Sequence, residues 1–173
     1  MLLFPAAFLG VLNIDEWIWF FFWALFIVVF YEHFLDTKHY SYRISHRVWC
    51  GIVFGILMSA GVIASFLVTP ELIDIQYAYL LVGGAAVLPA LYTMFRYPTI
   101  IPKLIFLIPF FFCVYLAFEL IALHFGWWSF DGNYVSLVTI LGLTFALEEL
   151  VIWIILGSAV VAAYHELLVD DQR

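Results

Sequence analysis

Long apolar stretches without a single charge constrain this chain more than any other feature. The clearest runs from Val48 to Val68, 21 residues that include no Asp, Glu, Lys or Arg. A helix that spans a bilayer needs about 20 predominantly apolar residues. Hydrophobic residues make up 67% of the chain and charged residues 11%, against roughly 45–50% and 25% in soluble domains. These figures exclude a soluble or disordered chain and predict a polytopic membrane protein.

The apolar runs predict an all-α transmembrane bundle of about five spans, formed by residues 1–173 as a single domain. The expected spans are Trp17–Leu35, Val48–Val68, Ile75–Phe95, Leu104–Leu123 and Leu147–Tyr164. The last apolar region, Val135–Ala163, is too long for one untilted span, so Val135–Phe145 is treated as a separate short segment. Met1–Ile14 is too short to span and is expected to be an interfacial helix. No basic residues precede its apolar run, so no cleaved signal peptide is expected.

The basic residues predict an orientation for these spans. Five of the six lie in two loops on the same side, residues 36–47 and 96–103, and the opposite loops hold acidic residues but no Lys or Arg. The positive-inside rule makes the basic side cytoplasmic, which puts the N-terminus outside and the C-terminus in the cytoplasm. The net charge of −7 and the lack of a basic stripe exclude nucleic acid as a partner.

Four carboxylates lie inside apolar runs, where each needs an explanation because ionisable groups in the bilayer are costly. Glu32 is close to the cytoplasmic end of its span and is interpreted as a helix end that reaches the interface. Glu119 lies late in the fourth span, and Glu148 and Glu149 begin the last one. In the predicted topology these three carboxylates converge at one depth, in the non-cytoplasmic half of the membrane.

An aromatic loop containing Trp127, Trp128 and Phe130 lies between Glu119 and the glutamate pair. A carboxyl group in a low-dielectric site tends to keep its proton, and adjacent carboxyl groups oppose each other's ionisation. Aromatic ring faces stabilise cations. Such a site is suited to protonating an alkene and holding a carbocation. The alternative is that the carboxyl groups only bond one another or backbone carbonyls between helices.

Other chemistries have weaker support. A retinal Schiff base needs a lysine within a span, and both lysines lie in loops. A metal site is possible in principle, but the spacing of its ligands is irregular, and a solvated polar loop is the simpler interpretation. The residues concerned are His33, Asp36, His39, His46, His165 and Glu166. No metal and no soluble cofactor is predicted. Gly51, Gly55, Gly83 and Gly84 are interpreted as sites of close helix packing, within the chain or in an oligomer contact.

Three motifs follow one another in the C-terminal half of the chain. They are Phe118-Glu119-Leu120, Gly126-Trp127-Trp128-Ser129-Phe130 and Ala146-Leu147-Glu148-Glu149-Leu150. In this order they resemble the membrane-integral lycopene cyclase domain of the heterodimeric or fused type. The resemblance extends from Phe110 to Leu167, within a segment of about residues 104–167. The family has proline where this chain has Ala146, and more often Asp where it has Glu119.

The resemblance implies a carotenoid end-group cyclase that isomerises a linear polyene without a redox step. It implies that Glu148 or Glu149 protonates the terminal alkene, and that the other glutamate and Glu119 tune this acid and help to remove a proton at the end. Trp127, Trp128 and Phe130 would shield the cation. The implied partner is an apolar polyene or lipid that enters from the bilayer. Because the family often carries two such domains and this chain has one, a homo- or hetero-oligomer with another membrane subunit is expected.

Two further classes of function stay open. The first is a non-catalytic membrane subunit that binds pigment or lipid within a larger complex, which the single domain and the aromatic content of 21% favour. The second is a small proton-coupled carrier that uses the same carboxylates. The absence of an internal sequence repeat makes the carrier the weaker of the two.

Overall fold

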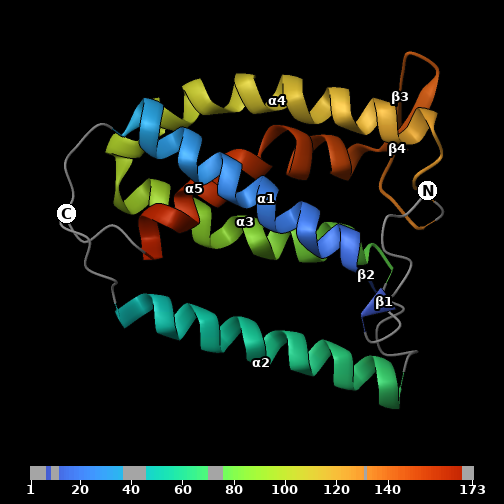
Figure 1. The fold of residues 1–173 in the computed structure, drawn as a ribbon, viewed down its shortest axis with the longest axis horizontal. Coiled ribbons are helices and arrows are strands. Elements are labelled where there is room, and N and C mark those ends of the chain that lie inside the picture. The colour runs from blue at the N-terminus through green and yellow to red at the C-terminus, as the bar shows by residue number, and fades with distance from the viewer. Residues whose placement is uncertain (1–6, 9–11, 37–45, 70–75, 131, 169–173) are drawn as a thin grey trace.

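The computed structural model describes residues 7–8, 12–36, 46–69, 76–130 and 132–168, and most of them are helical. The helical elements are α1 (Ile14–Phe30), the π-helix η1 (Tyr31–Leu35), α2 (His46–Val68), α3 (Ala78–Arg96), the 3-10 helix η3 (Pro98–Ile100), α4 (Ile101–His124), the π-helix η4 (Glu149–Ile155) and α5 (Gly157–Leu168). Figure 1 shows α1, α3, α4 and α5 gathered into a bundle, with α2 to one side. The prediction of a helical bundle is confirmed at this level.

Three of the described helical segments are long and apolar enough to cross a membrane: Ile18–Leu35, Ala78–Arg96 and Pro98–His124. A fourth candidate is the pair η4 and α5, which is bent by 51°. In α2, the apolar stretch among the described residues covers only Ile52–Ser65. The structure therefore indicates a membrane-embedded chain, whereas the expected five spans are not confirmed.

The core lies where α1, α4 and α5 meet α3. Large side chains on α1 and α4, such as Ile27 and Leu107, are fully buried against small residues on α5, such as Ala159 and Ala162. Small residues let helix backbones approach closely, which matters in lipid because packing rather than hydrophobicity drives helix association there. This close packing holds the ends of the three helices in fixed positions relative to one another.

Gly83 is the glycine at which close helix packing is required. A Cβ added there would lie 2.7 Å from Cδ1 and 2.9 Å from Cγ2 of Ile152, whereas a Cβ at Gly84 or Gly55 would meet nothing within 4 Å. Close packing within the chain is thus confirmed at Gly83, whereas Gly84 and Gly55 make no such contact within the chain. The surroundings of Gly51 lie outside the described set.

We therefore expect Gly83→Ala to lower the free energy of unfolding by about 1–3 kcal/mol, because it overpacks the contact between α3 and η4. Gly84→Ala is the matched control, since it adds the same methyl group one residue away in open space and alanine favours the helix. Thermal unfolding of both variants in the same detergent measures the difference. Equal melting temperatures would contradict the close approach.

The expected all-α fold is incomplete, because the segment Val135–Phe145 forms a β-hairpin. Strand β3 (Leu137–Ile140) pairs antiparallel with β4 (Leu143–Ala146), and Leu141 and Gly142 form a two-residue turn in which both have positive φ. Two-residue hairpin turns favour this left-handed backbone because it matches the twist of the strands. The hydroxyl groups of Thr139 and Thr144 are 3.0 Å apart across the ladder. The hairpin places Glu148 and Glu149 directly at the start of the following helix.

The expected interfacial helix at Met1–Ile14 is also wrong for the residues that the structure describes. Ala7–Phe8 (β1) and Leu12–Asn13 (β2) form a short antiparallel pair, and α1 begins at Ile14. The other residues of that segment lie outside the described set.

Candidate functional site

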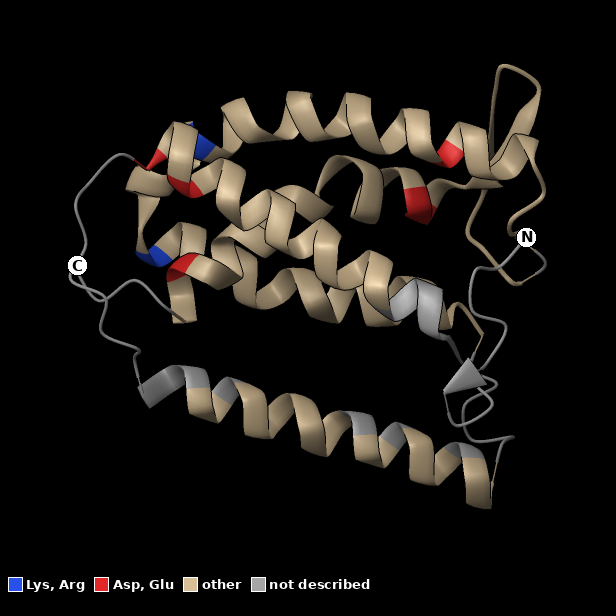
Figure 2. Cartoon of the chain, viewed as in Figure 1, with Lys and Arg blue, Asp and Glu red and all other residues tan. Residues whose placement is uncertain are grey.

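Three buried carboxyl groups define the candidate site. The exposed fractions of Glu119, Glu148 and Glu149 are 1%, 4% and 6%. Figure 2 shows the acidic position of α4 and the acidic start of η4 at the same end of the bundle. The acidic residues of α4 and η4 thus lie at one end of the bundle (Figure 2), and α4 and η4 share an apolar cluster around Tyr115 and Ile154.

Glu119 projects from α4 toward the aromatic loop. Its Oε1 accepts a hydrogen bond from Nε1 of Trp128 at 3.0 Å. Its Oε2 is buried and has no hydrogen-bond partner among the described residues. A buried polar oxygen without a hydrogen-bond partner is costly, so its position needs an explanation. Glu119 therefore has one carboxyl oxygen held in place by Trp128 and one oxygen without a described partner.

Glu148 has the same arrangement with a different donor. Its Oε1 accepts a hydrogen bond from the backbone N–H of Val135 at 2.6 Å, which ties the start of the last helix to the segment before the hairpin. Its Oε2 is also buried and lacks a partner within the part of the chain that the structure describes. The segment before the hairpin thus fixes one carboxyl oxygen of Glu148, and the other oxygen has no described partner.

Glu149 points to another element. Its Oε2 accepts a hydrogen bond from the hydroxyl of Tyr79 on α3. The ring of Tyr79 in turn contacts the ring of Tyr134, with centroids 6.1 Å apart. Glu148 and Glu149 are therefore held by different partners, the N–H of Val135 and the hydroxyl of Tyr79 on α3.

The three aromatic residues of the loop lie in different surroundings. Trp128 bonds Glu119 and its ring lies 5.6 Å from that of Phe118. Trp127 also contacts Phe118, at 6.1 Å, but its side chain is mostly exposed. Phe130 is half-buried and packs in the cluster around Tyr115 and Phe145. Of the three predicted aromatic residues, Trp128 is therefore the one that is hydrogen-bonded to a site carboxyl group. Phe118, which was not predicted as part of the site, contributes a further ring beside Trp128.

The backbone around Ala146 has a geometry that a proline would also satisfy. Leu147 N donates to Ser136 O at 2.9 Å. Because hydrogen-bonded pairs alternate along an antiparallel ladder, the next pair, Leu137 with Ala146, is not hydrogen-bonded. The N–H of Ala146 therefore points away from β3, and proline there removes no ladder hydrogen bond.

We expect Ala146→Pro to keep its free energy of unfolding within about 1 kcal/mol of the parent chain. Leu147→Pro is the matched control, and it should lose about 1 kcal/mol more because it deletes the bond to Ser136 O. Chemical denaturation in detergent compares the two variants. A larger loss for Ala146→Pro than for Leu147→Pro would contradict this register.

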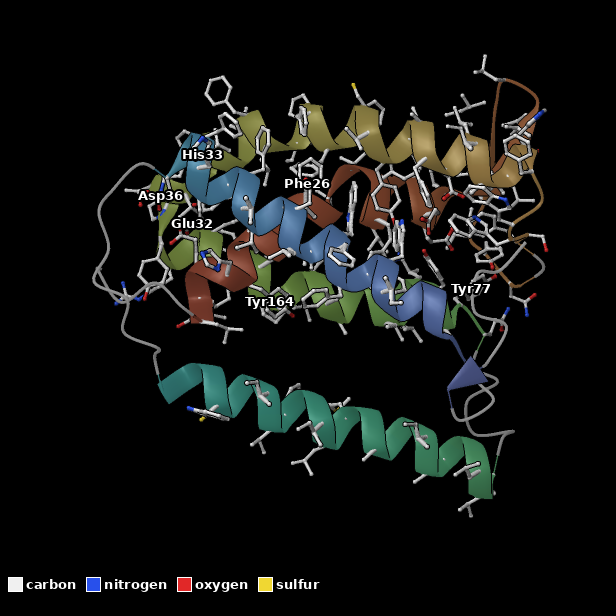
Figure 3. All side chains as sticks on the ribbon, in the orientation of Figure 1. Phe26, Glu32, His33, Asp36, Tyr77 and Tyr164 are labelled. Atoms are coloured by element: carbon white, nitrogen blue, oxygen red, sulfur yellow. The ribbon has the colours of Figure 1, made fainter. Side chains whose placement is uncertain are left out.

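A second polar cluster lies at the opposite end of the bundle, where Figure 3 labels Glu32, His33 and Asp36. Lys103 Nζ is 2.8 Å from Asp36 Oδ2 and 3.7 Å from Glu166 Oε1. Glu166 also accepts a hydrogen bond from the hydroxyl of Tyr31. These contacts join η1 and the ends of α4 and α5, so this cluster fastens three helices together.

Glu32 and His165 form a separate contact in the same region, with Oε1 and Nε2 2.6 Å apart. Glu32 is thus paired as well as close to the end of its helix. Among the described residues, no group of three His, Cys, Asp or Glu side chains could hold a metal ion. Of the ligands considered for a metal site, His39 and the side chain of His46 lie outside the described set.

Sequence reasoning missed Tyr79, Tyr31 and the N–H of Val135 as partners of the carboxyl groups. Two of these partners are tyrosines in or at the end of apolar runs. A polar hydroxyl in such a run is the sequence feature that could have indicated a hydrogen-bond partner. Comparisons with known proteins found no family model, no curated protein and no solved structure that matches this chain.

Proposed function

We propose that this chain is a carotenoid end-group cyclase of the lycopene type, or a close relative, which cyclises a linear polyene in the membrane by acid catalysis. The observation that carries the proposal is the shared arrangement of Glu119 and Glu148. Each is buried with one oxygen fixed by an N–H donor and the other without a partner among the described residues. The motif order from Glu119 to Glu149 supports the choice of substrate.

The reaction needs a proton donor and a proton acceptor but no oxidant or reductant. A carboxylic acid gives its proton to the terminal alkene, which leaves a tertiary carbocation. A neighbouring double bond attacks this cation, so that a carbon–carbon bond closes the ring and the positive charge moves to a ring carbon. Loss of a proton from an adjacent carbon restores a double bond, and the product is an isomer of the substrate.

Each carboxyl group has a role in this scheme. Glu148 is assigned as the proton donor, with its Oε1 held by the N–H of Val135 and its Oε2 without a partner among the described residues. Glu149 is oriented by Tyr79, and Glu119 accepts the proton at the end. A positioned general acid contributes about 100-fold to 10,000-fold to a rate. The rings of Trp128 and Phe118 lie beside Glu119, where cation–π attraction stabilises the developing charge.

Pigment analysis in a lycopene-accumulating host tests the activity. Cells that express the chain should accumulate ring-ended carotenoid, either with the chain alone or with a second membrane subunit. Lycopene left unchanged by the chain under both conditions, with the protein present in the membrane, would overturn the proposal.

A non-catalytic pigment-binding subunit is the second candidate, favoured by the many aromatic contacts between α1 and α4. Gentle purification distinguishes the two functions. A stoichiometric bound pigment or a stable partner subunit, without any turnover, would favour the binding subunit. The same preparation also gives the oligomeric state, for which we expect a homo- or hetero-oligomer with another membrane subunit.

We also propose that the end of the bundle with Arg96 and Lys103 faces the cytoplasm. Arg96 ends α3 and Lys103 lies in the first turn of α4, and Figure 2 shows the basic positions of these helices at the end opposite the acidic site. With this orientation the N-terminus is outside and the C-terminus is cytoplasmic, and the acidic site lies in the non-cytoplasmic half of the membrane. Protease protection of C-terminally tagged protein in sealed vesicles tests the orientation.

A further inference from the structure

Aromatic rings join α1 to α4 along most of their shared length. Near the cytoplasmic ends, Phe30 stacks on Phe110 with centroids 4.4 Å apart. Further along, the ring of Trp23 meets Phe111 at 5.4 Å and Tyr115 at 4.9 Å, both edge to face. These successive contacts form one continuous line of rings between two candidate spans.

The same line leads to the acidic site. Trp19, one turn before Trp23, stacks on Phe118 with centroids 5.1 Å apart. Phe118 contacts the ring of Trp128, and Trp128 donates to Glu119. The line of rings therefore ends at a buried carboxyl group rather than at an arbitrary point on the surface.

One edge of this line faces outward. Phe111 and Tyr115 are buried, whereas Phe26 and Phe110, whose centroids are 6.3 Å apart, are 43% and 41% exposed. Figure 3 shows Phe26 about midway along the bundle, between α1 and α4. The inner rings pack the helices together, and the outer rings are free to contact a molecule dissolved in the bilayer. We call this outer edge the aromatic track.

We propose that the aromatic track binds the chain of a linear conjugated polyene and directs its end to Glu119 and Glu148. The choice of occupant rests on the proposed cyclase function and on the continuity of the track with the acidic site. From Phe110 to Glu119 the helix rises about 14 Å, so the contact is extended along the chain of the ligand.

A polyene fits this track better than a lipid acyl chain for two reasons. Its flat π-system stacks on aromatic faces, and such contacts add affinity beyond the apolar area they bury. Its conjugated chain is also stiff, so it loses less conformational freedom on binding than a saturated chain does. For these two reasons, we expect a polyene to displace lipid that occupies the aromatic track in the absence of substrate.

Binding of lycopene to the purified protein in detergent tests the track. The probe is the induced circular dichroism of the lycopene absorption band, which reports binding whether or not a ring forms. The variant Phe26→Leu/Phe110→Leu removes two rings of the track, and we expect its Kd to rise about tenfold. The matched control is Phe21→Leu/Phe106→Leu, which removes two rings that are equally apolar and more exposed.

The control pair should bind lycopene as the parent chain does. Equal Kd values for both double variants would overturn the track, as would equally strong competition by a fully saturated hydrocarbon of the same length. The proposed cyclase function fails separately. If the parent chain binds lycopene through the aromatic track but does not cyclise it, the track proposal stands and the cyclase proposal does not. If the chain cyclises lycopene while both double variants bind lycopene with equal Kd values, the cyclase proposal stands and the aromatic track does not.

Discussion

Glu148→Gln is expected to lower ring formation by about 100-fold to 10,000-fold, the usual contribution of a general acid. Glutamine keeps the shape of the side chain and can still accept the hydrogen bond from the N–H of Val135. It has no proton that can be transferred to an alkene. Ring-ended carotenoid per unit of membrane protein, measured by chromatography of pigment extracts, gives the ratio.

Three further variants make this result specific. Glu149→Gln should lower the rate less, because Glu149 is bonded to Tyr79. Glu32→Gln is the control, since it changes a carboxyl group at the opposite end of the bundle. Tyr79→Phe should resemble Glu149→Gln if the tyrosine acts by positioning that glutamate. Unchanged ring formation in both Glu148→Gln and Glu149→Gln would contradict the assignment of the acid.

Lys103→Met is expected to lower the free energy of unfolding by about 3 kcal/mol. Lys103 is the cation shared by Asp36 and Glu166, whose side chains are each only 4% exposed. Removing one member of a buried ion pair costs about 3–5 kcal/mol, because the remaining charge stays in a poorly solvated place. The lower end applies because the side chain of Lys103 is 24% exposed. Denaturant titration in mixed micelles measures the loss.

Arg96→Met is the matched control for this prediction. It removes a basic residue at the same end of the bundle, whose described contact is with the ring of Tyr97 at 5.5 Å. Surface interactions of this kind contribute little, so we expect a loss below about 1 kcal/mol. The triple variant Lys103→Met/Asp36→Asn/Glu166→Gln should recover part of the lost stability. A loss for Arg96→Met as large as that for Lys103→Met would mean that burial of the ion cluster is not the cause.

The ends of a helix were predictable where an apolar run of membrane-spanning length ends close to charged residues or proline. The helix expected at Val48–Val68 is α2, which ends at Val68 as predicted, and the expected span Leu104–Leu123 lies within α4. The hairpin was missed because Val135–Phe145 contains no charged residue, and a short apolar run does not by its pattern distinguish strands from a helix. Its turn also places Leu141 at positive φ, a conformation that a leucine rarely adopts and that no local pattern predicts.

The candidate site was predictable in its carboxyl groups and not in their partners. Glu119, Glu148 and Glu149 are conspicuous because acidic residues in apolar runs need a reason. Tyr79 lies 70 residues before Glu149, and Lys103 meets Asp36 and Glu166 only through the packing of three helices. No periodicity in the sequence records such pairings, because they depend on how the helices rotate and shift against one another.

The most direct measurement of the central claim is isotope incorporation by the purified protein. Lycopene is incubated with the protein in heavy water, and the cyclised product is analysed by mass spectrometry. Acid catalysis by a carboxyl group that exchanges with solvent predicts a product that gains a single deuterium per ring and is otherwise an isomer of lycopene. A product without deuterium, or one that differs from lycopene in its number of hydrogens, would contradict the account.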